Sequence, residues 1–330
     1  MNKLKVAVLG GGWFGQFHLD NLLKMEDVEV AAFATGNVER LARLSVKEPR
    51  ARAYSDQRDL IAQERDLDAL IVCVPPDRHD GIEHLAARNG INLYMEKPLG
   101  VDLKEVLACE KAISESGIVC AVGYQTRYNP QVDEMKARFD NDEIGVAAAK
   151  WIGVTPQTPW WRIKARSGGQ FVEQATHMVD LLRYFFGDVE SVYSARRFGL
   201  LRGVPDYDVE DASATVLVFE SGLLATVTCG CFVDPKEGKS EVRIEMYGKR
   251  QRFVYEWDTM VRWENRRESS VRCFGNEFHF PALRTFLDAA RAKDASKIRS
   301  PYADAVKTFK TTWAANLSME NHAEVSLRSL

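Results

Sequence analysis

Short apolar runs alternate with segments of helical period over roughly the first 120 residues, and this rhythm constrains the fold more than any other feature. Continuously apolar or β-branched runs suit strands that are buried on both faces of a parallel sheet. We expect strands at 5–9, 28–34, 69–74, 91–95 and 118–122, and helices at 13–24, 38–46, 57–63, 78–89 and 103–116. Such alternation predicts an α/β fold with a doubly wound parallel sheet.

The rhythm changes after about residue 124. Long β-rich runs follow one another at 191–198, 212–220, 223–231, 241–247, 251–257 and 260–264, after a strand at 147–154. Helices are expected at 131–139, 172–186, 281–292 and 303–316. Because helices stop separating the strands after residue 190, the sequence predicts two domains, 1–123 and 124–330. The second is expected to be an α+β domain with a large, open, mostly antiparallel sheet that is polar on one face.

The charge balance excludes several classes of partner, since 44 Lys and Arg stand against 47 Asp and Glu. This balance offers no basic surface for nucleic acid or for an anionic membrane. No run approaches the roughly 18 apolar residues of a membrane span, and the N-terminal apolar run is too short for a signal peptide. The six cysteines show neither a CxxC pair nor the rhythm of a disulfide scaffold. We therefore expect a reduced, cytoplasmic protein.

A glycine-rich segment, GGGWFG at residues 10–15, directly follows the first expected strand. It fits the G-x-G-x-x-G pattern, whose glycines allow a tight turn and a close backbone approach to a pyrophosphate at a helix start. The pattern is specific where it opens the first βα unit of a parallel sheet. It predicts a Rossmann domain that binds a dinucleotide through Gly10, Gly12, Trp13, Phe14 and Gly15.

The end of the second expected strand bears on the choice between NAD and NADP. A carboxylate about 20 residues beyond the glycines would bind the adenine ribose of NAD. Here the strand ends in Thr35, Gly36 and Asn37, and Arg40 follows one turn later. Arg40 can pair with a 2′-phosphate, so these residues favour NADP(H), with NAD(H) as the alternative. The competing interpretation is that Arg40 is a solvated residue of the second helix.

The segment Glu96-Lys97-Pro98 follows the fifth expected strand. Ligands of open α/β sheets bind at the carboxyl ends of the strands, so Lys97 stands where chemistry is expected. A lysine there can polarise a substrate oxygen and exchange a proton with it. The competing interpretation is an ordinary surface ion pair between Glu96 and Lys97.

A second group of titratable residues lies in the expected helix 172–186. Glu173, His177 and Asp180 are spaced i, i+4 and i+7, which would place them on one face of the helix. Histidine suits general acid–base work near neutral pH. The competing interpretation is a solvated helix face.

In order and spacing these motifs resemble the Gfo/Idh/MocA oxidoreductases along essentially the whole chain. The segments that carry the resemblance are the glycine-rich loop, Glu96-Lys97-Pro98, residues 123–130 (GYQTRYNP), the helix ending at Asp180, and residues 302–305 and 325–327. The resemblance implies that Lys97 and His177 act together at a sugar or cyclitol carbinol. This chain departs from the family in having Glu173 where Asp is usual and Ala175 where Gly is frequent.

The resemblance also implies roles for other positions. Val74, Pro75 and His79 match the stretch that passes the nicotinamide ribose, and Trp161 with Arg162 matches a pair at the cofactor and active-site mouth. The implied cofactor-binding residues are Gly10, Gly12, Trp13, Phe14, Gly15, Thr35, Gly36, Asn37, Arg40, Val74, Pro75, His79, Glu96, Lys97, Gln125, Trp161 and Arg162. The implied substrate-binding residues are Lys97, Arg127, Trp160, Glu173, His177 and Asp180, of which Lys97, Glu173, His177 and Asp180 are the catalytic candidates.

The sequence therefore predicts an NAD(P)-dependent oxidoreductase that transfers hydride to or from a secondary carbinol of a sugar, a sugar derivative or a cyclitol. Two alternatives stay open. One is an enzyme that cleaves glycosidic bonds through transient 3-keto oxidation and elimination. The other is a cofactor-binding sensor or assembly protein without turnover.

Two further expectations concern metals and assembly. The histidines show no HExxH spacing, and His79 and His84 are five residues apart, off a common helix face, so no metal site is predicted. A large open sheet seldom stays uncovered, which predicts a homodimer or homotetramer through the C-terminal sheet.

Overall fold

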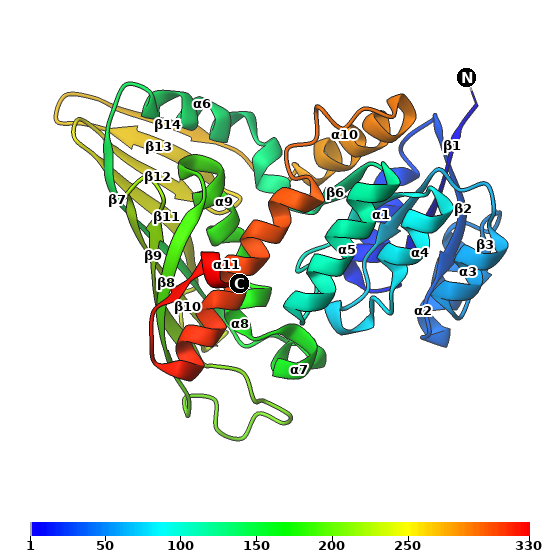
Figure 1. Cartoon of the computed structure of the whole chain (residues 1–330), viewed down its shortest axis with the longest axis horizontal. Coiled ribbons are helices and arrows are strands. Elements are labelled where there is room, and N and C mark those ends of the chain that lie inside the picture. The colour runs from blue at the N-terminus through cyan, green and yellow to red at the C-terminus, as the bar shows by residue number, and fades with distance from the viewer. Residues whose placement is uncertain (1) are drawn as a thin grey trace. The chain divides into compact units, whose positions relative to one another are not determined.

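The computed structural model describes residues 2–330, and the chain divides into two compact units (Figure 1). The first unit comprises the residues up to Gly123 together with His279–Asp304, and the second comprises Tyr124–Phe278 and Ala305–Leu330. Within residues 2–330, no helix combines the length and the apolar character needed to cross a bilayer.

A six-stranded parallel sheet forms the centre of the first unit, with strand order β3-β2-β1-β4-β5-β6. The strands are β1 (Leu4–Leu9), β2 (Val28–Ala34), β3 (Arg52–Tyr54), β4 (Ala69–Val72), β5 (Asn92–Met95) and β6 (Cys120–Val122). The predicted doubly wound sheet is confirmed, and the order reverses between β1 and β4, where ligands of such sheets bind.

Helices connect these strands in turn, and several begin and end at residues that suit helix caps. They are α1 (Trp13–Leu22), α2 (Val38–Lys47), α3 (Gln57–Gln63), η1 (Pro76–Arg78), α4 (Ile82–Asn89) and α5 (Leu103–Ser116). As predicted, Asp102 caps α5 by accepting the Glu105 N–H at 2.9 Å, and Gly117 ends the helix in a left-handed conformation.

The segment 279–304 packs with the first unit, whereas the sequence pattern predicts it in the second domain. It contains α10 (His279–Ala292), whose Leu283, Phe286 and Leu287 are buried in the core formed by strands β1, β2, β4 and β5. Arg284 and Arg291 also bind Asp27 at 2.8 Å each. A return of the chain to an earlier domain leaves no local pattern in the sequence, because α10 is an ordinary amphipathic helix.

A nine-stranded sheet forms the second unit, in the order β14-β13-β12-β11-β7-β10-β9-β8-β15. The strands are β7 (Ile144–Val154), β8 (Val189–Arg197), β9 (Ala212–Phe219), β10 (Leu224–Val233), β11 (Glu241–Gly248), β12 (Arg252–Glu256), β13 (Met260–Glu264), β14 (Ser269–Cys273) and β15 (Val325–Ser326). Every neighbouring pair is antiparallel except β7 and β10, which confirms the expected mostly antiparallel sheet.

Helices cover one face of this sheet (Figure 1). The helical elements are η2 (Gln125–Tyr128), α6 (Pro130–Phe139), η3 (Pro159–Arg162), α7 (Lys164–Ser167), α8 (Gln170–Glu173), α9 (Thr176–Phe186), α11 (Tyr302–Asn321) and η4 (Leu327–Ser329). Apolar side chains of α6, α9 and α11 form the core with the inward residues of the strands.

Four features of the secondary structure differ from the expectation. The expected helix 172–186 is two helices, α8 and α9, which are separated at Gln174 and Ala175. Strands β3, β14 and β15 were not expected, because each is too short or too polar to produce a recognisable apolar run.

Candidate functional site

The glycine-rich loop leaves no room for side chains on the side that faces the sheet. Gly10 has φ +100°, and a Cβ there would lie 2.4 Å from the carbonyl oxygen of Cys73. A Cβ on Gly15 would lie 1.8 Å from the carbonyl oxygen of Gly10. At Gly12, the nearest atom to such a Cβ is Arg40 Nη1 at 3.8 Å, so the loop is open there. This arrangement brings the first backbone N–H groups of α1 to a space that suits a pyrophosphate.

Arg40, a residue of α2, packs against this loop beside Gly11. A Cβ on Gly11 would meet the Arg40 Cβ and the Thr35 Cγ2, each at 3.0 Å. Asn37 caps α2 and accepts the Arg40 N–H at 2.8 Å, which fixes where the Arg40 side chain starts. Gly36 completes the turn between Thr35 and Asn37. The four residues predicted to select the cofactor therefore lie together beside the glycine loop.

Trp13, the first residue of α1, is 67% exposed despite its size. Its ring stacks on Phe17 with centroids 5.4 Å apart and meets the edge of Phe14 at 4.7 Å. An exposed indole at the phosphate loop is positioned to report ligand binding through its fluorescence.

The stretch after β4 also borders the loop. The backbone nitrogen of Val74 would lie 3.1 Å from a Cβ on Gly10, and Pro75 precedes the short helix η1. His79 is buried, and its Nδ1 is 2.6 Å from an oxygen of Glu83. Burial alone would lower the pKa of His79, but the Glu83 carboxylate raises it above the ordinary value. His79 is thus held in a buried pair with Glu83.

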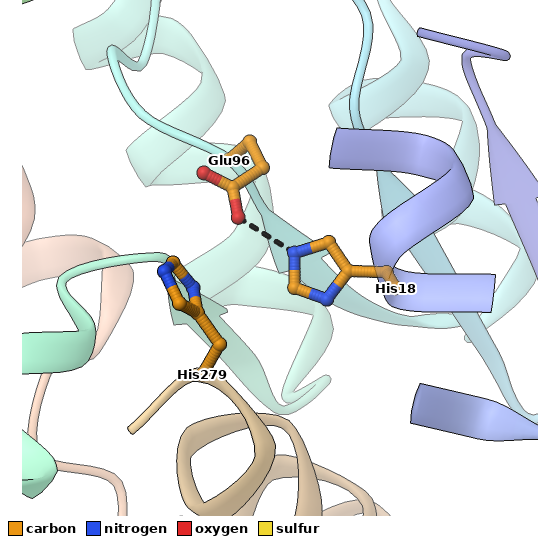
Figure 2. Close-up of side chains that lie close together, drawn as sticks. All are labelled: His18, Glu96 and His279. Atoms are coloured by element: carbon orange, nitrogen blue, oxygen red, sulfur yellow. Dashed lines mark hydrogen bonds and ion pairs between the residues drawn. The ribbon is translucent and has the colours of Figure 1, made fainter. Parts of the chain in front are cut away.

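Glu96 belongs to a buried cluster with two histidines that the sequence did not reveal. Figure 2 shows His18 of α1, Glu96 after β5 and His279 of α10 pointing toward one another. His18 Nε2 is 2.7 Å from Glu96 Oε1, and Glu96 is only 8% exposed. A Cβ on Gly123 would lie 2.9 Å from the same carboxylate. The interpretation of Glu96 as half of a surface ion pair is therefore wrong.

Lys97 follows this cluster in the chain, at the carboxyl end of β5, and its peptide bond to Pro98 is cis. Burial has the largest effect on His279, and although the Glu96 carboxylate opposes it, the pKa of His279 is lowered to about 4. His279 is therefore neutral near pH 7. The predicted catalytic lysine thus directly follows a buried, hydrogen-bonded carboxylate in the chain.

In the second unit, His177 lies between aromatic rings. Its imidazole stacks on Trp151 with centroids 5.6 Å apart and an interplanar angle of 17°, and it contacts Trp257 at 4.8 Å. The Tyr124 and His177 rings meet edge to face, with centroids 6.2 Å apart. The Tyr124 hydroxyl is 2.8 Å from the Thr176 hydroxyl. Burial is the first cause that raises the pKa of Tyr124, which therefore stays protonated. These rings fix the plane of the imidazole.

Glu173 lies on α8 and His177 on α9, so the predicted three-residue stripe is interrupted. Both side chains are nevertheless buried, at 2% and 9% exposure. Side-chain amides stabilise the interruption between α8 and α9. Gln174 accepts the Trp151 indole N–H at 2.6 Å and donates to the side chain of Gln170 at 2.8 Å. The chain between Glu173 and His177 is thus tied to the strand that carries Trp151.

Asp180 and Arg127 bind each other. Two guanidinium nitrogens donate to the two carboxylate oxygens at 2.8 and 2.6 Å, and the hydroxyl of Thr308 donates to Asp180 at 3.0 Å. Both charged residues are buried. A bidentate pair of this kind fixes geometry and neutralises both charges. The structure therefore shows Asp180 and Arg127 as a buried ion pair one helical turn from His177.

The remaining predicted residues of the second unit lie on loops and short helices. Trp160 and Trp161 form an edge-to-face pair with centroids 5.6 Å apart in η3. Arg162 donates to the carbonyl of Pro156 at 2.8 Å and thereby closes the same loop. Gln125 is buried, and its Oε1 has no hydrogen-bond partner among residues 2–330.

Sequence reasoning missed four residues of these clusters: His18, His279, Trp151 and Trp257. The tryptophans lie within predicted strands, but their meeting depends on the order of β7, β11 and β12, which the sequence does not state. His18 and His279 lie on amphipathic helices whose pairing is equally invisible in sequence.

Comparison with known families gives matches to both units. Residues 4–124 match the oxidoreductase family with an NAD-binding Rossmann fold, and residues 132–254 match the GFO/IDH/MocA C-terminal domain.

Individual proteins are similar to this chain over much of its length. The chain is 29% identical over 233 residues to the NAD(+)-dependent scyllo-inositol 2-dehydrogenase of Bacillus subtilis, covering 68% of this chain and 67% of that enzyme. It is 25% identical over 315 residues to the inositol 2-dehydrogenase of Rhizobium meliloti, covering 93% and 87%. The solved structure of levoglucosan dehydrogenase with NADH has a TM-score of 0.87 at 19% identity and covers 99% of both chains.

The pKa of His279 predicts how stability depends on pH. The unfolded chain binds a proton on this residue near the ordinary pKa of 6.5, whereas the folded protein binds it only near pH 4. Acid therefore favours unfolding between these values. Chemical denaturation should show that wild type loses about 3 kcal/mol more stability between pH 7 and pH 4 than His279→Gln does. The exposed His322→Gln variant should follow wild type, and parallel profiles for wild type and His279→Gln would contradict the assignment.

Proposed function

The chain belongs to the Gfo/Idh/MocA oxidoreductase family, and on that premise we propose that it transfers hydride between NADP(H) and a secondary carbinol of a sugar or cyclitol. The observation that carries the proposal is the glycine cradle at the start of α1, in a unit that presents Lys97 at the carboxyl end of β5.

The residues of the first unit fit a bound dinucleotide. Gly10 and Gly15 allow the close approach that side chains would block, and the first turn of α1 has no side-chain cap, so its N–H groups suit phosphate oxygens. When bound, the nicotinamide supplies a hydride acceptor or donor at its C4 carbon. Trp13, Val74 and Pro75 border the same loop and are proposed to contact the cofactor.

We propose Lys97 and His177 as the groups that handle the hydroxyl proton. Oxidation of a carbinol sends the C–H hydride to the nicotinamide and the O–H proton to a base on the protein. Lys97 stands beside the buried Glu96, and His177 is fixed by Trp151 and Trp257. The aromatic packing holds the His177 imidazole in one orientation, which favours proton transfer to a bound oxygen.

The other acidic candidates receive different proposed roles. Asp180 is paired with Arg127, so we propose that the pair positions α9 and His177 rather than binding substrate directly. Glu173 is proposed to bind a substrate hydroxyl, and Trp160 to stack on a ring face of the substrate.

The substrate class follows the relatives that share most of the chain. Two of them are named inositol 2-dehydrogenases, and one of these covers 93% of this chain. A cyclitol or a cyclic sugar presents secondary carbinols flanked by hydroxyls, which suits a site with both carboxylate and aromatic groups.

The assignment of Lys97 and His177 predicts a specific kinetic result. Lys97→Met and His177→Ala should each lower kcat by about a hundredfold or more, because each removes a proton-transfer group. The dissociation constant of the cofactor, measured by quenching of tryptophan fluorescence, should change little. Turnover is measured by NAD(P)H absorbance with a panel of inositols and sugars.

Lys111→Met serves as the matched control, since Lys111 is exposed on α5. It should retain wild-type turnover. Near-normal turnover in both Lys97→Met and His177→Ala would refute the assignment.

The preference for NADP(H) is a separate proposal that rests on Arg40. Its side chain lies on the glycine loop, where a guanidinium can bind a 2′-phosphate. Arg40→Ala should weaken NADP(H) binding by about tenfold or more and leave NAD(H) binding nearly unchanged. Arg43→Ala, an exposed arginine of the same helix, is the control. An equal loss of affinity for both cofactors would contradict the proposal.

The outer face of the nine-stranded sheet is proposed to bind a second copy of the chain. Strand register places the exposed Tyr247, Val146 and Leu224 side by side across β11, β7 and β10, and pairs the exposed Val216 with Tyr193. Contiguous exposed apolar side chains of this kind mark an association surface.

Light scattering should therefore give at least twice the chain mass of 37.3 kDa for wild type, with the double variant Val146→Asp/Leu224→Asp shifted toward that mass. The added carboxylates would have to be buried without partners. A monomeric wild type would overturn this proposal.

A further inference from the structure

Three side chains with different metal-ligating atoms converge between α4 and α5 in the first unit. These two helices are neighbours in the fold (Figure 1). His84 projects from α4, and Glu105 with Cys109 projects from α5 at i and i+4, on one helix face. His84 Nε2 is 3.3 Å from Glu105 Oε1 and 3.6 Å from Cys109 Sγ, and Cys109 Sγ is 3.7 Å from Glu105 Oε1.

This triangle matches the ligand spacing of a tetrahedral zinc ion. Zinc bonds of about 2.0–2.3 Å at tetrahedral angles separate nitrogen from oxygen by about 3.3–3.4 Å and sulfur from either by about 3.5–3.6 Å. The three observed distances agree with these values to about 0.2 Å. We propose that His84, Glu105 and Cys109 form a site for a divalent transition-metal ion, with zinc as the favoured ion.

The other histidine and carboxylate cluster of this unit does not have such geometry. His18 and Glu96 are only 2.7 Å apart, a hydrogen-bond distance that is too short for two ligands of one zinc ion. That cluster is also next to the positive charge of Lys97, which opposes a cation. Ligand spacing therefore distinguishes a hydrogen-bonded cluster from a metal-binding one in the same unit.

The surroundings of Cys109 favour a cation. The carboxylates of Glu83 and Glu105 both place negative charge near the thiol. The phenol of Tyr302 lies against the same thiol. Cys109 is buried, whereas the side chains of His84 and Glu105 are 30% and 61% exposed, so an ion can enter from solvent.

Binding would join the two helices that flank β5, the strand that ends before Glu96 and Lys97. Each protein ligand donates an electron pair, and the Cys109 thiol releases its proton to solvent to become a thiolate. A fourth position stays open to water. The ion would thus link α4 to α5, and its binding would weaken as the pH falls.

The test is zinc binding to the full chain, measured by isothermal titration calorimetry after removal of metals with a chelator. Wild type should bind one zinc ion per chain. Cobalt(II) should give the visible bands of a tetrahedral complex and a thiolate charge-transfer band. Zinc should also raise the thermal midpoint of wild type, because it binds only the folded chain.

His84→Gln, Glu105→Gln and Cys109→Ser should each weaken zinc binding by at least about a hundredfold, since each removes a direct ligand. The glutamine variants change a half-buried and an exposed side chain, so they test the site even where Cys109→Ser impairs folding. Cys273→Ser, His322→Gln and His279→Gln should bind as wild type does, because none of these residues belongs to the triangle.

The proposal is overturned if wild type and the three ligand variants bind zinc equally, or if His279→Gln alone abolishes binding. Metal binding is read without any substrate or nicotinamide. Its outcome is therefore independent of whether the chain is a sugar or cyclitol dehydrogenase.

Discussion

The close approach of the glycine loop to β4 is the constraint on which the first unit depends. The carbonyls of Cys73 and Gly10 occupy the positions that side chains at Gly10 and Gly15 would need. The close contact between these backbone segments sets where α1 begins. The first N–H groups of α1 therefore lie next to the open space at Gly12. The packing of the sheet and the capacity to hold a pyrophosphate thus have one physical cause. The same loop supports Arg40, on which the proposed choice of cofactor rests.

Each proposed proton-transfer group has a buried cluster of side chains as its neighbour, and we assign no proton-transfer role to these clusters. In the first unit, His18 binds Glu96, the residue before Lys97, and burial keeps the nearby His279 neutral. In the second unit, His177 packs against the rings of Trp151 and Trp257. Glu96 is paired with His18, Asp180 is paired with Arg127, and the lowered pKa of His279 keeps it neutral near pH 7. Desolvation is therefore compensated locally, as buried polar groups require.

Much of the fold was readable from the sequence, because apolar runs in a parallel sheet and the caps of α5 are local signals. The glycine loop and Lys97 at the end of β5 were readable for the same reason. Contacts between distant segments were not readable. Three features depend on tertiary packing: α10 packs with the first unit, the helix is interrupted before His177, and His84 of α4 meets Glu105 and Cys109 of α5. A search for ligand spacing within one helix cannot find a site that is shared by two helices.

The proposed reaction moves a hydride directly from a carbinol carbon to the nicotinamide. The most direct measurement uses inositols and sugars deuterated at their carbinol carbons, with NMR of the reduced cofactor. Direct transfer predicts one deuterium at C4 of the nicotinamide for each substrate molecule that is oxidised. Reduced cofactor without deuterium, or no reduction across the panel by protein that binds the cofactor, would contradict it.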